Sequence, residues 1–242
     1  MILPPAYRLV ALESVDSTNE EAKRRAREGA EDGTLVWAKE QNAGRARRGR
    51  DWRSPAGNLY LSLVLRPDAP PSRHGELGFV AALAVGATVG AFVPPLVDLR
   101  YKWPNDVLVS GRKASGILLE SESGADWVIL GVGINVESFP TGTETPATSL
   151  REEGAGEATV EEVLDCFAHA FLLWVNRWVD DGFGPIRAAW LGRAQGLGAR
   201  IRVRLPNETL EGRFADLDIS GALILETDAG RRLVSAGEVF AL

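Results

Sequence analysis

The residues best suited to chemistry form an arginine- and glycine-rich segment, GRARRGRDWR, at residues 44–53, called here the arginine loop. It has five arginines within nine residues, in a chain whose net charge is -6. The planar fork of arginine binds carboxylate or phosphate through paired hydrogen bonds. Because the charges repel one another, we expect the loop to be mobile until an anion binds. From composition alone, a solvated basic loop or a nucleic-acid contact, with Trp37 and Trp52 stacking on bases, explains it as well.

A second group of reactive side chains lies in Lys102-Trp103-Pro104-Asn105-Asp106. The Trp-Pro step favours an extended turn, which sets Asn105 and Asp106 at the end of a strand. A carboxylate there is an oxygen ligand of the kind that Mg²⁺ prefers. Lys113, which follows after one hairpin, is placed to neutralise charge that develops on a phosphate. The alternative is that Asp106 caps a turn and Lys113 is solvated.

Two further segments have the composition of ligand-binding positions. Asp16-Ser17-Thr18-Asn19 precedes a predicted helix, whose free backbone N–H groups favour polar or anionic ligands. Overlapping capping boxes, Ser17 with Glu20 or Thr18 with Glu21, explain the hydroxyls equally well but not Asn19. Gly131-Val132-Gly133 lies inside a predicted strand, where glycines mark the close approach of a ligand or another backbone. Neither a dinucleotide fingerprint nor a P-loop is present in the sequence.

The elements that must position these residues follow from the apolar patterns. They predict an α+β fold with a mixed or antiparallel sheet flanked by helices. Strands are expected at 7–12, 34–39, 58–65, 99–103, 107–109, 113–120 and 127–136, and helices at 17–29, 75–93, 159–181 and 185–191. A capping box of Thr159 with Glu162 marks the start of the third helix. Residues 139–156 are predicted to be a surface excursion.

The pattern changes after the glycine-rich joint at 192–198. Short strands alone are expected there, at 200–205, 209–215, 222–226 and 231–235, which describes a small β-barrel. We therefore predict a larger α+β domain at 1–193 and a small C-terminal domain at 194–242.

Composition excludes several classes of function. A net charge of -6 and a pI of about 5.2 argue against bulk attraction to nucleic acid or an anionic membrane. The single cysteine, Cys166, is typical of a reducing compartment and lies in a core-like helical pattern. His74 and His169 suit neither a zinc site nor a catalytic triad. The N-terminus has no signal-peptide pattern, and the apolar run 77–93 is better explained as a buried helix than as a membrane span, so we expect a cytoplasmic protein.

Taken together, these motifs resemble the biotin–protein ligase (biotin–acetyl-CoA-carboxylase ligase) family over about residues 7–240. The resemblance is carried by Asp16–Asn19, Gln41, the arginine loop with Trp52, Asn58-Leu59-Tyr60, Lys102–Asp106, Gly111-Arg112-Lys113 with Gly116-Ile117-Leu118, Gly131–Val136, Ser220–Leu223 and Gly237-Glu238-Val239. It implies a catalytic domain like those of class II synthetases and biotin–lipoate ligases, followed by an SH3-like domain.

The resemblance also implies substrates and roles. ATP and Mg²⁺ would activate biotin as an adenylate, and a lysine of a biotin carboxyl carrier protein would accept it. Catalytic roles would fall to Lys113, Arg47, Asp106 and Asn105, with Mg²⁺ at Asp106. Biotin and its adenylate would be bound by Ser17, Thr18, Asn19, Gln41, Gly44, Arg45, Ala46, Arg47, Arg50, Trp52, Lys113, Gly131, Gly133 and Asn135, with Trp52 near the adenine.

Two departures from the family pattern carry expectations of their own. Ala46 stands where the family usually has glycine, and a positive φ there would cost about 1 kcal/mol. Few residues precede the first predicted strand, so we expect no helix-turn-helix and no DNA binding. A monomer and a homodimer both agree with the sequence.

Two other functions remain as alternatives. A lipoate–protein ligase would use related activation chemistry, although the intact arginine loop and Lys102–Asp106 argue against it. A nucleic-acid-binding protein that uses the arginine loop and the barrel is disfavoured by the net charge.

Overall fold

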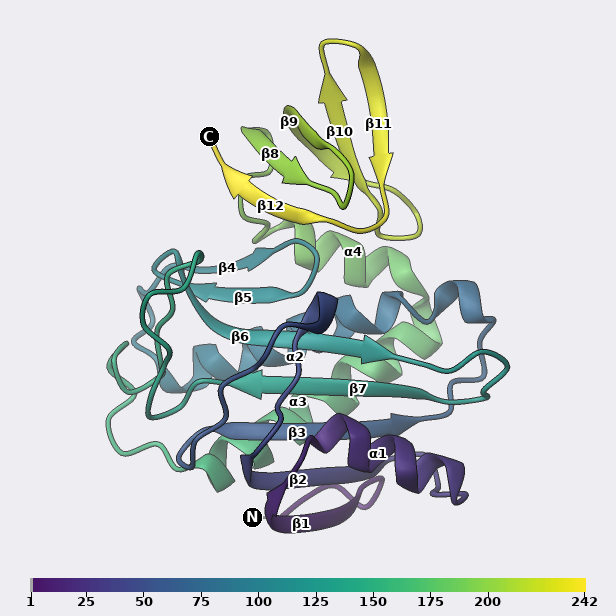
Figure 1. Cartoon of the computed structure of the whole chain (residues 1–242), viewed down its shortest axis with the longest axis vertical. Helices are drawn as coiled ribbons and strands as arrows, with labels where there is room; N and C mark the ends of the chain where they lie inside the picture. The colour runs from purple at the N-terminus through teal and green to yellow at the C-terminus, as the bar shows by residue number, and fades with distance from the viewer. Residues whose placement is uncertain (1) are drawn as a thin grey trace.

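A seven-stranded mixed sheet forms the centre of the larger part of the molecule in this computed structural model, which describes residues 2–242 (Figure 1). The strand order is β1-β2-β3-β7-β6-β5-β4, with β1 and β2 parallel and all other neighbours antiparallel. The predicted mixed sheet is therefore confirmed. The strands are β1 (Arg8–Val15), β2 (Thr34–Gln41), β3 (Leu59–Leu65), β4 (Leu99–Lys102), β5 (Asp106–Val109), β6 (Arg112–Glu120) and β7 (Val128–Ile134).

Helices cover both faces of this sheet. One face packs against α2 (Glu76–Phe92), behind which lie α3 (Val160–Asp181) and α4 (Phe183–Leu191), and the other packs against α1 (Thr18–Arg27) (Figure 1). Because α2 lies between the sheet and α3, it is apolar on nearly all sides. The stretch Pro71–Phe92 is long and apolar enough to cross a membrane, but most of it is buried in this core, as predicted.

Strand β3 is buried on both of its faces. Its leucines alternate with Tyr60, Ser62 and Val64, and all seven residues are buried. The reason is its central position, with α1 on one face and the α2–α3 layer on the other. Ser62 is consequently a hydroxyl inside the fold, which becomes important at the site.

The two predicted capping boxes have different outcomes. At α3 the box forms, because Thr159 accepts from the Glu162 backbone N–H and the Glu162 carboxylate accepts from that of Thr159. At α1 the prediction is wrong, because Ser17 occupies the N-cap position without a side-chain hydrogen bond. The Thr18 hydroxyl is instead directed at Gln41. Polar residues at this helix start therefore remain available for other partners.

The C-terminal part is a five-stranded antiparallel sheet of order β11-β10-β9-β8-β12. Four strands were predicted, and the fifth, β12, pairs with β8 and lies on the side of this sheet that faces the seven-stranded sheet (Figure 1). Its four residues are too few to show a clear alternation. The strands are β8 (Arg200–Arg204), β9 (Thr209–Leu217), β10 (Leu223–Thr227), β11 (Gly230–Val234) and β12 (Glu238–Ala241).

Residues 139–156 are only partly the predicted surface excursion. Thr148, Ser149 and Leu150 are buried. They are held by backbone hydrogen bonds, since the Lys113 N–H donates to Pro146 O and the Thr148 N–H donates to Lys113 O. This segment therefore forms a wall beside the start of β6.

Candidate active site

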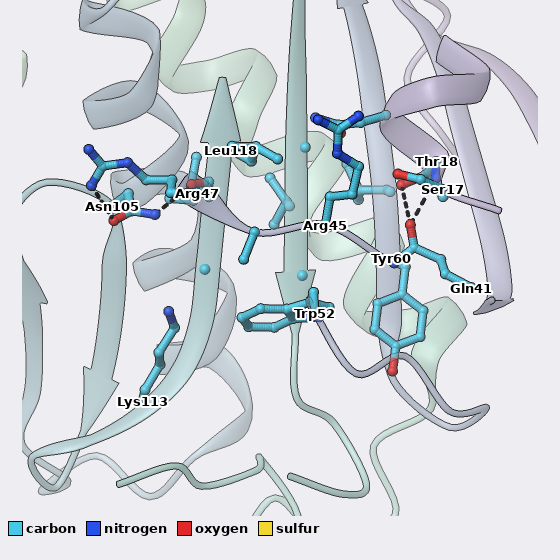
Figure 2. Close-up of a pocket in the computed structure, with 18 residues that line it drawn as sticks. Ser17, Thr18, Gln41, Arg45, Arg47, Trp52, Tyr60, Asn105, Lys113 and Leu118 are labelled. Atoms are coloured by element: carbon cyan, nitrogen blue, oxygen red, sulfur yellow. Dashed lines mark hydrogen bonds between the residues drawn. The ribbon is translucent and has the colours of Figure 1, made fainter. Parts of the chain in front are cut away.

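A polar pocket, called here the first cavity, opens over the middle of the catalytic sheet where α1, β2 and the arginine loop meet (Figure 2). Gln41, the last residue of β2, organises one side of it. Its Oε1 accepts from the Thr18 backbone N–H at 2.8 Å and from the Thr18 hydroxyl at 3.1 Å, while its Nε2 donates to Ser54 Oγ at 2.8 Å. Every potential ligand contact on this side is an uncharged amide or hydroxyl.

Asn19 forms the floor of the first cavity. Its Nδ2 donates to Glu120 Oε2 at 2.8 Å, and its Oδ1 lies 2.5 Å from Ser62 Oγ. A Cβ on Gly131 would stand 2.1 Å from Asn19 Oδ1, so only glycine lets this amide lie flat on β7. The predicted close approach at Gly131 is thus to a side chain of the protein.

The indole of Trp52 lies against two further glycines. A Cβ would come within 2.8 Å of the ring at Gly133 and within 2.9 Å at Gly116. Figure 2 places Trp52 between Lys113 and Tyr60, and the Lys113 ammonium is 5.2 Å from the centre of the ring. With the indole there, the first cavity measures only about 40 Å³, and Trp52 separates it from a larger neighbour.

The larger neighbour, the second cavity, has a volume of about 500 Å³ and lies between the arginine loop, the β4–β5 turn and β12. The Lys113 Nζ is 2.6 Å from Asp106 Oδ1, so the two residues face one cleft as the hairpin predicts. Lys102 contributes a second ammonium, whose pKa is lowered by burial. This cavity combines several cations with enough space for a nucleotide-sized anion.

The arginine loop is held by carboxylates. Arg45 pairs with Glu20 and Glu120, and Arg48 and Arg50 pair with Glu238. The charges of the loop are therefore not left to repel one another as the sequence suggested, since acidic residues from α1 and from both sheets compensate them.

Arg47 is the exception within the arginine loop. Among residues 45–50 of the described chain, it is the arginine without an ion pair, and it lines both cavities. Its Nη1 donates to Asn105 Oδ1 at 3.3 Å, and burial lowers the pKa of its guanidinium. A cation held in partly desolvated surroundings without a carboxylate is well placed to bind an anionic ligand.

Ala46 does not have the strained backbone that its place in the loop suggested. Its φ is -121° and its ψ 177°, which is extended backbone open to any residue. The positive φ values fall on Arg48, at 60°, and on Gly49, at 69°, in the 3₁₀ turn Arg47–Gly49. Ala46 therefore fits this conformation without a conformational penalty.

Most of the predicted site residues are brought together. The first cavity is lined by Ser17, Thr18, Asn19, Gln41, Arg45, Ala46, Arg47, Trp52, Asn105, Lys113, Gly131 and Gly133, and the second adds Arg50, Asp106 and Asn135. Gly44 begins the arginine loop, where its carbonyl accepts from the Trp52 N–H at 2.9 Å. The Asn135 amide donates to Thr148 O at 2.9 Å and so holds the cavity wall.

Three site residues had no predicted role. Ser62 lies 2.8 Å from Thr18 Oγ1 as well as beside Asn19, Glu120 orients the Asn19 amide, and Glu238 reaches the arginine loop from the C-terminal sheet. A hydroxyl within the apolar run LYLSLVL is a signal that could have identified Ser62. The two carboxylates have no local pattern that distinguishes them from surface acids.

Asp106 is the residue best placed to hold a divalent cation. No group of three or more His, Cys, Asp or Glu side chains with metal-binding geometry occurs within residues 2–242. Mg²⁺ often takes only one or two carboxylates when substrate phosphates supply the other oxygens. Asp106, one of the four acidic residues that line the second cavity, fits that requirement.

The mixed sheet, the small all-β C-terminal unit and a pocket of amides and hydroxyls beside a cluster of cations are features of an enzyme that acts on anionic substrates. The chain belongs to the biotin/lipoate A/B protein ligase family, whose model matches residues 51–192. A second model, described as the biotin protein ligase C terminal domain, matches residues 196–242.

Individual relatives agree with this membership. A Paracoccus denitrificans protein named biotin–[acetyl-CoA-carboxylase] ligase is 44% identical over 237 residues, covering 95% of this chain and 98% of the relative. The bifunctional ligase/repressor BirA of Bacillus subtilis is 35% identical, covering 96% of this chain and 73% of that protein. The biotin protein ligase of Aquifex aeolicus, solved with biotin and ATP, superposes with a TM-score of 0.84 at 28% identity over 96% of this chain and 97% of its own.

Proposed function

We propose that this chain is an ATP-dependent biotin–protein ligase, which activates biotin as biotinyl-5′-AMP and transfers it to a lysine of a biotin carboxyl carrier protein. The observation that carries the proposal is the junction, at Arg47 and Lys113, of a pocket that has one side of uncharged amides and hydroxyls with a larger cavity that has several cations in its wall. The P. denitrificans relative is named for this activity, and the A. aeolicus enzyme was solved with biotin and ATP.

The first cavity suits the fused rings of biotin. The ureido head is uncharged and has both N–H donors and a carbonyl acceptor, for which Thr18, Asn19 and Gln41 supply complementary groups. The glycine surface of β7 at Gly133 is covered by the Trp52 indole, so the rings reach it only when that side chain moves. Because the first cavity measures about 40 Å³, we expect the Trp52 indole to shift when biotin enters.

The second cavity suits ATP. In this assignment Lys113 and Arg47 lie at the junction, where the biotin carboxylate meets the α-phosphate. Two anions repel one another, and fixed cations in a partly desolvated cleft lower the barrier to bringing them together. Trp52, which separates the cavities, would then lie close to both halves of the adenylate.

In this proposal the Asp106 carboxylate would hold Mg²⁺ together with phosphate oxygens. The ion would neutralise charge on the phosphates. Asn105 positions the turn, because its Nδ2 donates to Ile117 O at 2.8 Å and its Oδ1 accepts from Arg47. Asn105 thereby connects the motif 102–106 to the arginine loop.

The reaction needs no enzyme nucleophile. A carboxylate oxygen of biotin attacks the α-phosphorus, the bond to the β-phosphate oxygen breaks, and pyrophosphate leaves. The neutral amine of the acceptor lysine then attacks the acyl carbon, AMP departs with the bonding electrons, and solvent takes the amine proton. The arginine loop would protect the adenylate from water between the two steps. We place the reaction in the cytoplasm, where ATP is available and Cys166 stays reduced.

The decisive experiment is exchange of labelled pyrophosphate into ATP with biotin or lipoate as the acid. Biotin-dependent exchange, followed by labelling of a carrier-domain lysine, is the expected result. Exchange with lipoate alone would assign the lipoate ligase activity, and exchange with neither acid would refute an adenylating enzyme.

A further inference from the structure

The arginine loop meets the C-terminal sheet through Arg48 and Arg50. The partner of both is Glu238, the first residue of β12. The Glu238 carboxylate forms an ion pair with Arg50, lies 3.7 Å from Arg48 and lies 2.5 Å from Arg204. Only 13% of the Glu238 side chain is exposed. Three guanidinium groups thus surround one largely buried carboxylate.

Backbone carbonyls of the C-terminal sheet extend this contact. Arg47 Nη1 donates to Gly237 O at 3.4 Å, and Arg48 Nη2 donates to Arg204 O at 3.4 Å. At the opposite end of the arginine loop, Arg45 pairs with Glu20 of α1. The loop is thus fastened at both ends, and Arg47 lies between the two points.

Glu238 is charged in this setting. Burial acts to raise the pKa of its carboxyl group, but the hydrogen bond from Arg204 and the charge of Arg50 outweigh burial and leave that pKa below its usual value. Without this negative charge, Arg48, Arg50 and Arg204 would repel one another. Among the ion pairs of residues 2–242, Glu238 is the only carboxylate that contacts all three of these arginines.

We propose that Glu238 is a positioning residue of the ligase reaction, whose carboxylate fastens the arginine loop to the C-terminal sheet and so holds Arg47 over both cavities. The inference rests on the proposed function for its effect on catalysis, although the contact itself does not. It gives the C-terminal sheet a definite task, which is to keep the loop closed over the bound adenylate.

A competing role makes the opposite prediction. Glu238 could act as an internal anion that occupies Arg48 and Arg50 until ATP phosphates displace it. Neutralising Glu238 would then tighten nucleotide binding and leave the loop better available to ligands. Under the positioning role, the same change loosens the loop and weakens retention of the adenylate.

The first test reads the arginine loop directly and does not depend on activity. Trypsin cleaves after arginine, and its rate at residues 45–53 reports how often the loop opens. For Glu238→Gln without ligands we expect cleavage there to be about ten-fold faster than in the unchanged protein, the effect of losing one charge-assisted contact. The matched control is Glu226→Gln, which removes the exposed pair with Arg213 in the same sheet.

Thermal unfolding of both variants completes that test. Unchanged cleavage in Glu238→Gln overturns the proposal. So does a general loss of stability that exposes arginines throughout the chain. The double variant Arg50→Gln/Glu238→Gln should be no more open than the worse single variant, because both changes break the same contact.

The second test follows release of bound biotinyl-5′-AMP in a rapid chase. We expect Glu238→Gln to release it about ten-fold faster and to have a raised KM for ATP, with kcat changed less. Slower release or a lowered KM would support the competing role and overturn ours. If the unchanged protein forms no adenylate, the proposed function fails while the trypsin result still decides the role of Glu238 in holding the loop.

Discussion

Replacing Lys113 with methionine is the perturbation whose size the structure best defines. The change keeps the length and most of the volume of the side chain but removes the ammonium that lies 2.6 Å from Asp106 Oδ1 and faces the second cavity. In the proposed reaction this ammonium binds the biotin carboxylate and the α-phosphate. Its loss should therefore affect adenylation more than any later step.

Two magnitudes separate a catalytic effect from unfolding. The side chains of Lys113 and Asp106 are 23% and 13% exposed, so breaking their pair should cost about 1–2 kcal/mol, less than for a fully buried pair. A domain with roughly 5–15 kcal/mol of stability stays folded after that loss. Removing one preorganised group from a charged transition state costs about 2.7–4 kcal/mol, a factor of 10²–10³ in rate.

The assay compares the two half-reactions. Biotin-dependent pyrophosphate exchange should fall by about 10²–10³-fold in Lys113→Met. Transfer from supplied biotinyl-5′-AMP to a carrier domain should fall by less than about ten-fold, because the phosphate is already bonded to the acyl group. Lys39→Met, which removes an exposed lysine paired with Glu13, is the control. Exchange within three-fold of the unchanged protein (roughly 0.65 kcal/mol) would show that Lys113 does not touch the reacting atoms.

Three other changes test separate parts of the structure. Ala46→Gly relieves no strain, because φ is -121°, so adenylate release should stay equal or become a few-fold faster; slower release would show that the closed loop needs a positive φ at this position. Gly131→Ala should lower the free energy of unfolding by about 1–3 kcal/mol, since its Cβ would meet Asn19. The control Gly90→Ala on α2 should raise the free energy of unfolding by about 0.5–1 kcal/mol. Equal melting temperatures for the two variants would contradict the packing at Asn19. Chelating Mg²⁺ should stop exchange without lowering the melting temperature, and Asp106→Asn should raise the Mg²⁺ concentration needed; identical Mg²⁺ dependence would remove Asp106 from that role.

Local chemistry in the sequence was enough to predict most of the elements and much of the site. Periodicity identified the central helices and the catalytic strands, and the Thr159–Glu162 box marked the start of α3 correctly, because these signals act within a few residues. The hairpin between β5 and β6 likewise brought Lys113, which pairs with Leu108 in the register, into the same cleft as Asp106. The charge density of residues 44–53 and the glycines of β7 also pointed to the site.

Local patterns in the sequence do not show which residues far apart in the chain become partners in the fold. The arginines looked mutually repulsive because their carboxylates lie elsewhere, at Glu120 on β6 and Glu238 on β12. The start of α1 looked like a capping box because Gln41, which takes the Thr18 hydroxyl, is 23 residues away. The glycines of β7 were predicted to mark the close approach of a ligand or another backbone, whereas the groups that pack on them are the side chains of Asn19 and Trp52. A positive φ was considered at Ala46, but in the folded chain the positive φ lies on Arg48. Sequence patterns record what a residue can do, whereas the compensating charge and the available space depend on segments that meet only when the chain folds.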